Sequence, residues 1–196
     1  MMKDRVEICL SGAGGQGLIL AGIILAEAAG IYEGKEVVQT QSYGPEARGG
    51  ASKSEVIISS EPIAYPKVIK ADILLALTQA ACDKYIKNLS RDGLLIVDSS
   101  LVPKIPVVPV QIYPFPITKI AQERLGTKLV INIISLGIIA GLTGVVSREA
   151  LKEAVYHRVP SRVKEINDQA LSLGFDLAQE LKLKERVSQI NTNKLK

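Results

Sequence analysis

Short apolar runs alternate with helical patterns through the first half of the chain. The runs Val6–Ser11 and Ala71–Leu77 are typical of strands buried on both faces of a parallel sheet. Between Leu18 and Gly30, apolar residues recur at i, i+3, i+4 and i+7, which predicts an amphipathic helix. This alternation indicates an α/β fold. We further predict strands at Glu36–Tyr43, Ser52–Ser59 and Gly93–Asp98, a proline-interrupted edge strand at Pro103–Ile112, and a helix at Gln79–Asn88. Only a short loop precedes Ser52–Ser59, so this strand is expected to be antiparallel or at an edge.

From Pro116 onward the pattern is helical. Residues 129–146 carry no charge and contain Gly137-x-x-x-Gly141, a spacing that permits close helix contact. Polar residues such as Asn132 dilute this segment, which favours a core helix packed on a sheet or a partner subunit over a membrane span. The predicted helices are Ile117–Leu125, Leu129–Leu142, Arg148–Arg158 (with Ser147 as N-cap) and Val163–Lys184.

We therefore predict a Rossmann-like, mostly parallel sheet with flanking helices and a helical C-terminal half. A single α/β domain is expected over residues 1–187, followed by a polar, frayed tail over 188–196. The net charge of +4 is scattered and only 4% of residues are aromatic, which argues against nucleic-acid binding. Cys9 and Cys82 lie far apart and form no CxxC pair, so the chain is not expected to hold an iron–sulfur cluster or a structural zinc. This cysteine content fits a reducing cytoplasm, and we expect no signal peptide before the first strand.

The segment Gly12-Ala-Gly-Gly-Gln-Gly17 connects the first predicted strand to the first predicted helix. Such a turn lets backbone N–H groups approach an anion at the helix N-terminus. In a dinucleotide fold Gly12 permits the tight turn, Gly14 the approach to a pyrophosphate, and Gly17 close helix–strand contact. That fold also places an acid at the end of the second strand, where this chain has Gln39-Thr-Gln-Ser42. The missing acid weakens an NAD site and leaves three readings: a plain phosphate, another nucleotide, or glycines that serve packing alone.

A second motif, Tyr43 to Gly50, follows the predicted second strand at its carboxyl end, where ligands of open α/β sheets bind. Arg48 could bind a phosphate or carboxylate, and the alternative is an exposed loop with solvated charges. Asp98, with the two serines after it, either lines the same site or caps the next segment. His157 is expected on a solvated helix face or in contact with a helix C-terminus. One histidine and two separated cysteines form no triad, dyad or metal cluster, so we predict no catalytic and no metal-binding residue.

These motifs together resemble those of the gamma subunit of 2-oxoacid:ferredoxin oxidoreductases. The resemblance rests on the glycine turn with Leu25-Ala-Glu-Ala-Ala29, on Gln41-Ser-Tyr-Gly-Pro-Glu-Ala-Arg-Gly-Gly50, on Ser54-Glu-Val-Ile-Ile-Ser59 and on Lys128-Leu-Val-Ile-Asn132. It covers residues 5 to about 180. The form Ala47-Arg-Gly-Gly50 is more similar to 2-oxoglutarate enzymes than to pyruvate enzymes, which tend to have Glu-Arg-Arg-Gly-Ala there.

The resemblance implies a subunit, not catalytic alone, of a complex that oxidatively decarboxylates a 2-oxoacid to acyl-CoA and reduces ferredoxin. It implies alpha and beta partner subunits, a ferredoxin-like delta subunit where present, and thiamine diphosphate, Mg²⁺ and 4Fe-4S clusters held by those partners. Coenzyme A, a co-substrate, carries phosphates and needs no acid for a nicotinamide ribose. The residues expected to face this ligand or a neighbouring subunit are Gly12, Gly14, Gly15, Gln16, Gly17, Tyr43, Glu46, Arg48, Gly49 and Gly50. The alternatives are an independent nucleotide-dependent oxidoreductase, a pyruvate- or indolepyruvate-type subunit, and a pure interaction protein.

Overall fold

The fold is built on a six-stranded sheet with the order β2-β3-β1-β4-β5-β6. A computed structural model describes residues 4–42 and 51–194, with side chains described up to residue 186. Strands β1, β4, β5 and β6 run parallel, while β3 is antiparallel to both of its neighbours. The strand bounds are β1 Arg5–Ala13, β2 Glu36–Ser42, β3 Ala51–Ser59, β4 Ala71–Ala76, β5 Leu89–Asp98 and β6 Gln111–Phe115.

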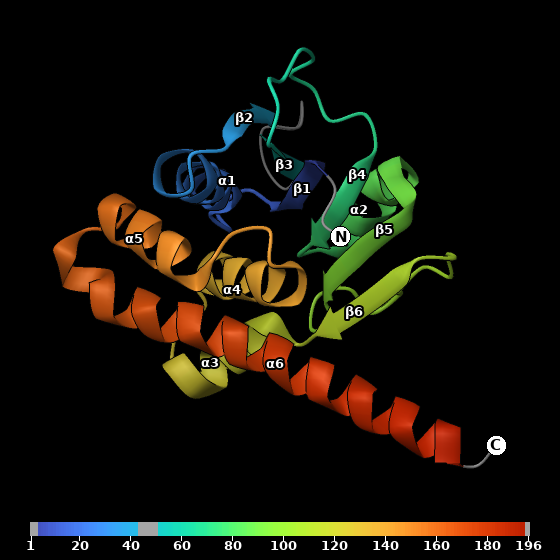
Figure 1. Cartoon of the computed structure of the whole chain (residues 1–196). Helices are drawn as coiled ribbons and strands as arrows, with labels where there is room; N and C mark the ends of the chain where they lie inside the picture. The colour runs from blue at the N-terminus through green and yellow to red at the C-terminus, as the bar shows by residue number, and fades with distance from the viewer. Residues whose placement is uncertain (1–3, 43–50, 195–196) are drawn as a thin grey trace.

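Helices cover both faces of this sheet (Figure 1). Side chains alternate along a strand, so Ile8 and Leu10 of β1 join the large core formed with α1, α4, α5 and α6. Cys9 points the other way, into the smaller core under α2. The bounds are α1 Leu18–Glu27, η1 Ala28–Tyr32 (a π-helical turn), α2 Gln79–Tyr85, η2 Ile86–Asn88, α3 Ile117–Leu125, α4 Ile131–Thr143, α5 Arg148–Arg158, η3 Ser161–Val163 and α6 Lys164–Lys194.

The predicted mostly parallel α/β sheet with a helical C-terminal half is confirmed. The strand predicted at 52–59 is antiparallel, as expected, but it lies inside the sheet, and β2 forms the edge. The edge strand predicted at Pro103–Ile112 is wrong in position, because the strand is β6 at Gln111–Phe115. Prolines 103, 106 and 109 lack the N–H that a ladder needs, so regular pairing begins only after them.

The uncharged segment around Gly137 forms α4, a core helix. Residues 131–140 are all buried, and α4 packs closely against α6, which continues past its predicted end at Lys184. The C-terminal part of α6 extends beyond the rest of the molecule (Figure 1). Among the described helices, none combines the length and the apolar character that a membrane crossing requires.

Cys9 and Cys82 are both free thiols within the smaller core. Burial raises the pKa of Cys9 to about 12 and also raises the pKa of Cys82. The reactive thiolate is therefore scarce at neutral and mildly alkaline pH. We expect iodoacetamide at about pH 8 to leave both thiols unmodified in the folded chain and to label both in guanidinium chloride. Mass spectrometry of intact protein measures the difference, and fast labelling of the native chain would contradict the buried placement.

Candidate functional site

The glycine turn lies at the carboxyl end of β1 and begins α1. Gly15 and Gly17 have φ angles of 88° and 72°, a left-handed conformation that favours glycine. The Gln16 side chain folds back into the turn, where its Oε1 accepts a hydrogen bond of 2.7 Å from the Ala13 N–H. Gly14 and Gly15 are exposed, and a Cβ atom on either would meet nothing within 4 Å. The outer side of the turn is thus open to a ligand, whereas Gln16 stabilises the turn itself.

The N-termini of α1 and α4 meet at this turn. No side chain caps either helix; Gly17 is the N-cap of α1 and Val130 that of α4. The Asn132 Nδ2 of α4 donates to the Gly17 carbonyl oxygen over 3.2 Å. A Cβ atom at position 17 would lie 2.6 Å from that nitrogen, so close contact and positive φ both require glycine. Two helix N-termini carry partial positive charge, which favours an anion beside them.

The described residues that flank the second sequence motif, Ser42 and Ala51, lie at the carboxyl end of β1 and β2. Ser42 ends β2 opposite Lys53, and Ala51 begins β3 opposite Ala13 of β1. Both residues that flank 43–50 therefore lie at the carboxyl end of β1, which is the end of the sheet that carries the glycine turn. Tyr43, Glu46, Arg48, Gly49 and Gly50 lie outside the described residues.

The topology also accounts for the missing ribose acid. In the dinucleotide fold the second strand lies next to the first and brings its acid to the ligand. Here β3 lies between β1 and β2, so the carboxyl end of β2 is one strand further from the glycine turn. Gln41 and Ser42 consequently do not occupy the place of that acid.

Asp98, at the end of β5, has a structural role. It is fully buried, and its Oδ1 accepts from the Ser100 N–H while its Oδ2 accepts from the N–H and hydroxyl of Thr118. These bonds fix the start of α3. Of the two interpretations left open by the sequence, the structure selects capping of the following segments.

His157 takes part in a cluster that the sequence interpretation missed. The Glu27 carboxylate, at the end of α1, is 2% exposed and contacts both His157 Nδ1 and Arg158 Nε at the end of α5. The expected position near a helix C-terminus is confirmed, since His157 lies in the last turn of α5 with its side chain 63% exposed, and the shared buried carboxylate is an additional contact. The available signal was Glu27 itself, the one charge in an otherwise apolar helix.

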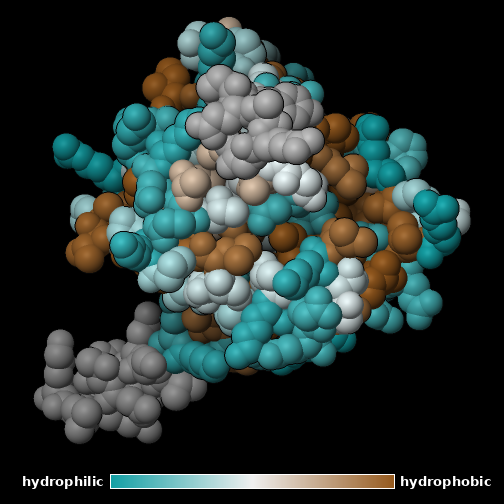
Figure 2. Space-filling model, turned by 180° about the vertical axis from the view of Figure 1, so that it is seen from behind, coloured by the Kyte–Doolittle hydropathy of each residue, from teal (hydrophilic) through white to brown (hydrophobic). Residues whose placement is uncertain are grey.

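Apolar side chains are exposed near the start of α1 and just before α4. Leu20 is 37% exposed, and Leu129, just before α4, is 87% exposed. Seen from behind, hydrophobic side chains gather on the side of the molecule where α1 lies (Figure 2). This surface adjoins the glycine turn through Gly17 and Asn132.

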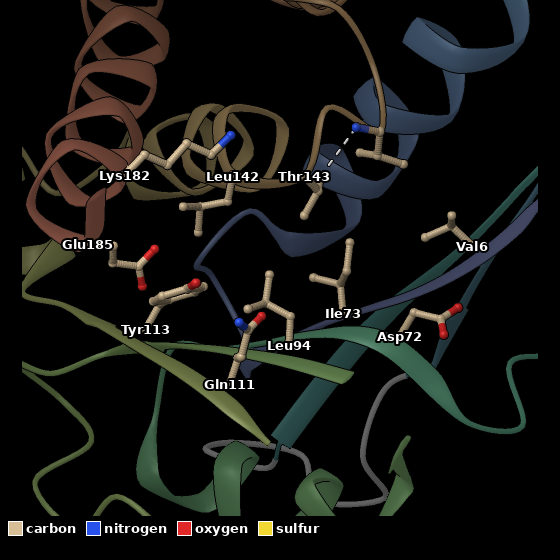
Figure 3. Close-up of a pocket in the computed structure, with 11 residues that line it drawn as sticks. Val6, Asp72, Ile73, Leu94, Gln111, Tyr113, Leu142, Thr143, Lys182 and Glu185 are labelled. Carbon is tan, nitrogen blue, oxygen red and sulfur yellow. Dashed lines mark hydrogen bonds between the residues drawn. The ribbon is translucent and has the colours of Figure 1, made fainter. Parts of the chain in front are cut away.

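A separate cavity of about 270 Å³ lies at the opposite end of the sheet, near the amino ends of β1, β4 and β6 (Figure 3). Ile73 and Leu94 lie on its sheet side, and Leu142 of α4 faces them. Burial and the neighbouring Glu185 raise the pKa of Tyr113 in its wall. The residues predicted for the ligand site and described here lie at the other end of the sheet. Across residues 4–42 and 51–194, no group of three or more His, Cys, Asp or Glu side chains is placed to hold a metal ion.

Comparison with known proteins gives consistent matches over most of the chain. Residues 7–177 match the family model "Pyruvate ferredoxin/flavodoxin oxidoreductase". The chain is 53% identical to the 2-oxoglutarate synthase subunit KorC of Methanocaldococcus jannaschii, over 92% of this chain and 97% of that protein.

Solved structures agree with these sequence matches. The crystal structure of a keto/oxoacid ferredoxin oxidoreductase gamma subunit from Geobacter sulfurreducens is similar with a TM-score of 0.84 and 53% identity, over 91% of this chain and 98% of that one. The fold is also shared with a 2-oxoglutarate:ferredoxin oxidoreductase from Magnetococcus marinus, solved with 2-oxoglutarate, coenzyme A and succinyl-CoA bound. That likeness has a TM-score of 0.81 and 24% identity, over 91% of this chain and 32% of that one.

Proposed function

Because this chain belongs to the pyruvate ferredoxin/flavodoxin oxidoreductase family, as a gamma subunit of the 2-oxoglutarate type, we propose that its glycine turn binds the phosphates of coenzyme A. The complex oxidatively decarboxylates 2-oxoglutarate to succinyl-CoA and CO₂ and passes two electrons to ferredoxin. In this proposal the isolated chain has no catalytic activity, and it contributes its part of the coenzyme A site within the assembled complex.

The observation that carries the proposal is the open, uncapped helix N-terminus at the glycine turn. The exposed backbone at Gly14 and Gly15 leaves room for a phosphate to approach closely. The N-termini of α1 and α4 supply favourable partial charge without a carboxylate in the turn. Ser42 and Ala51, which flank residues 43–50, lie at the same end of the sheet as the glycine turn, and this supports the proposal that Arg48 is a second phosphate ligand.

The remaining chemistry is assigned to partner subunits. Thiamine diphosphate with Mg²⁺, held by those partners, would supply the chemistry that activates the 2-oxoacid, and 4Fe-4S clusters held there would carry the electrons. The two cysteines of this chain are buried in the smaller core on β1 and α2, so they do not present thiolates to a cluster. The proposed partners are the alpha and beta subunits, a ferredoxin-like delta subunit where present, and ferredoxin as acceptor.

Gly14→Asp tests the phosphate site. The position is exposed with free space around a Cβ atom and its φ is not positive, so the variant is expected to fold. Two unit charges about 4–8 Å apart near a protein surface repel by roughly 2–4 kcal/mol. The KM for coenzyme A should therefore rise at least tenfold, while the KM for 2-oxoglutarate stays unchanged. Viologen reduction by the assembled complex measures both.

Gly14→Asn is the matched control, because it has the same shape without the charge. It should retain a KM for coenzyme A within a few-fold of the wild-type value. An unchanged KM in Gly14→Asp, in a complex that assembles normally, would remove the turn from the coenzyme A site. Tight binding of NAD(H) or NADP(H) to the chain by calorimetry would instead support an independent oxidoreductase.

A further inference from the structure

The apolar face of α6 changes sides where the helix leaves the body of the molecule. As far as Leu181, the apolar positions of α6 face α4 and the larger core, and Gly174 and Ala178 lie directly against α4. The next position on that side is Glu185, which lies beside Tyr113 in the wall of the cavity shown in Figure 3. The core-facing side of α6 therefore becomes polar beyond Leu181.

The outer side of α6 changes in the opposite sense and becomes apolar. Leu183 lies half a turn around the helix axis from Gly174, given about 3.6 residues per turn, and its side chain is 52% exposed. The sequence places Val187 and Ile190 four and seven positions later, on the same side of the helix. This end of α6 extends beyond the rest of the molecule (Figure 1). Because that side points away from α4, the spacing of four and three residues is suited to packing against a helix of another molecule.

The charges around Leu183 are self-complementary. Glu180 lies one turn before Leu183 and Arg186 one turn after it, and both are exposed. A second α6 laid antiparallel and centred on Leu183 therefore has its Arg186 opposite Glu180 of the first, whereas a parallel copy has Arg186 opposite Arg186. Over residues 176–186 the net charge is zero, because three acids accompany three bases: Asp176, Glu180, Glu185, Lys182, Lys184 and Arg186.

We propose that the end of α6 pairs antiparallel with the same helix end of a second copy of this chain. In a two-fold pair every contact occurs twice, so two Glu180–Arg186 ion pairs flank the two Leu183 side chains. A different partner with an acidic face would meet Glu180 as well as the bases, and one with a basic face would meet Arg186. The charge pattern therefore favours a second copy. The contact does not depend on the proposed coenzyme A site, and in the assembled complex it joins two complexes.

Charge reversal in the full-length chain tests this pairing. Glu180→Arg and Arg186→Glu each bring like charges together twice, so each variant should self-associate about tenfold or more weakly than the wild type. An equimolar mixture of the two variants should associate within a few-fold of the wild type, because every mixed contact again joins an acid and a base. Sedimentation velocity up to about 200 µM measures the association, since a short helix pair buries less area than a standard interface. Glu165→Arg, exposed at the other end of α6, is the matched control and should associate as the wild type does.

Leu183→Glu tests the apolar part of the contact. Because Leu183 is half-exposed, the variant should keep the far-ultraviolet circular dichroism of the wild type while its self-association weakens about tenfold or more. A wild-type chain that stays monomeric up to about 200 µM would overturn the pairing. So would variants that associate as the wild type does, or a mixture that associates no better than its components. If the same variants instead lose co-purification with the other subunits while the wild-type chain is monomeric, α6 docks on a partner subunit, which also overturns the pairing. Association regained only in the mixture supports it.

Discussion

Gly137→Leu is expected to prevent the chain from folding, and Gly137→Ala to lower the free energy of unfolding by about 1–2 kcal/mol. A Cβ atom at this position would lie 2.5 Å from the Leu171 carbonyl oxygen and 3.0 Å from the Gly174 Cα, both backbone atoms of α6. No side-chain rotation can relieve such contacts, so the helices must separate. Alanine recovers roughly 1 kcal/mol through its higher helix propensity, which is less than the overpacking cost of up to about 3 kcal/mol.

Chemical denaturation followed by far-ultraviolet circular dichroism measures this effect. Asp176→Ala, at an exposed position of α6, is the matched control, because it changes helix propensity without touching α4. It should leave the unfolding midpoint unchanged or raise it slightly. A Gly137→Ala protein more stable than wild type would mean that the helices do not approach as closely as described.

This crossing illustrates what spacing in a sequence can predict. Gly137 and Gly141 four residues apart in an uncharged helix predict close packing, and that prediction is confirmed. The predicted partner, a sheet or another subunit, is wrong, because α4 packs closely on α6 of the same chain. The matching glycine, Gly174, stands alone in an ordinary amphipathic pattern far along the chain, so the sequence did not indicate it. Close approach depends on both surfaces, and periodicity describes only one of them.

At the glycine turn, too, local sequence patterns predict the position of the feature but not the elements that pack against it. Its position between a strand and a helix follows from short-range patterns, and the structure agrees. The helix–strand contact expected at Gly17 is instead made by Gly22, whose Cβ atom would meet the Ser54 Oγ of β3, while Gly17 contacts Asn132 of α4. Both contacts depend on which elements pack on α1. The insertion of β3 next to β1 is a property of the sheet order, which local propensity does not encode.

Glu27 was missed for a related reason. A single acid within an apolar helix gives no indication of whether it faces solvent or a distant cation. The ends of α1 and α5 are brought together only by the packing of both helices in the larger core. The same packing that buries the carboxylate supplies the two side chains that compensate it.

Removing both of those side chains is expected to have the second large effect. The double variant His157→Gln with Arg158→Met should lower the free energy of unfolding by about 3–5 kcal/mol, because it leaves the Glu27 carboxylate, 2% exposed, without a compensating charge. Adding Glu27→Leu should recover most of this loss, since an apolar side chain of similar size suits the larger core. Thermal and chemical unfolding of the wild type, the double variant and the triple variant measure their order of stability.

The order of stability is informative because Glu27 is buried whereas His157 and Arg158 are exposed. The side chains of His157 and Arg158 are 63% and 42% exposed, so they remain hydrated when Glu27 is replaced, whereas the carboxylate cannot be hydrated when they are removed. Favourable contact of the Arg158 guanidinium with the C-terminus of α5 adds roughly 0.3–1 kcal/mol that the triple variant does not regain. Arg124→Met, at the exposed end of α3, loses a cation at a helix C-terminus without a buried carboxylate and should cost no more than that amount. A triple variant as unstable as the double variant would show that the side chains of His157 and Arg158 stabilise α5 directly, independently of Glu27.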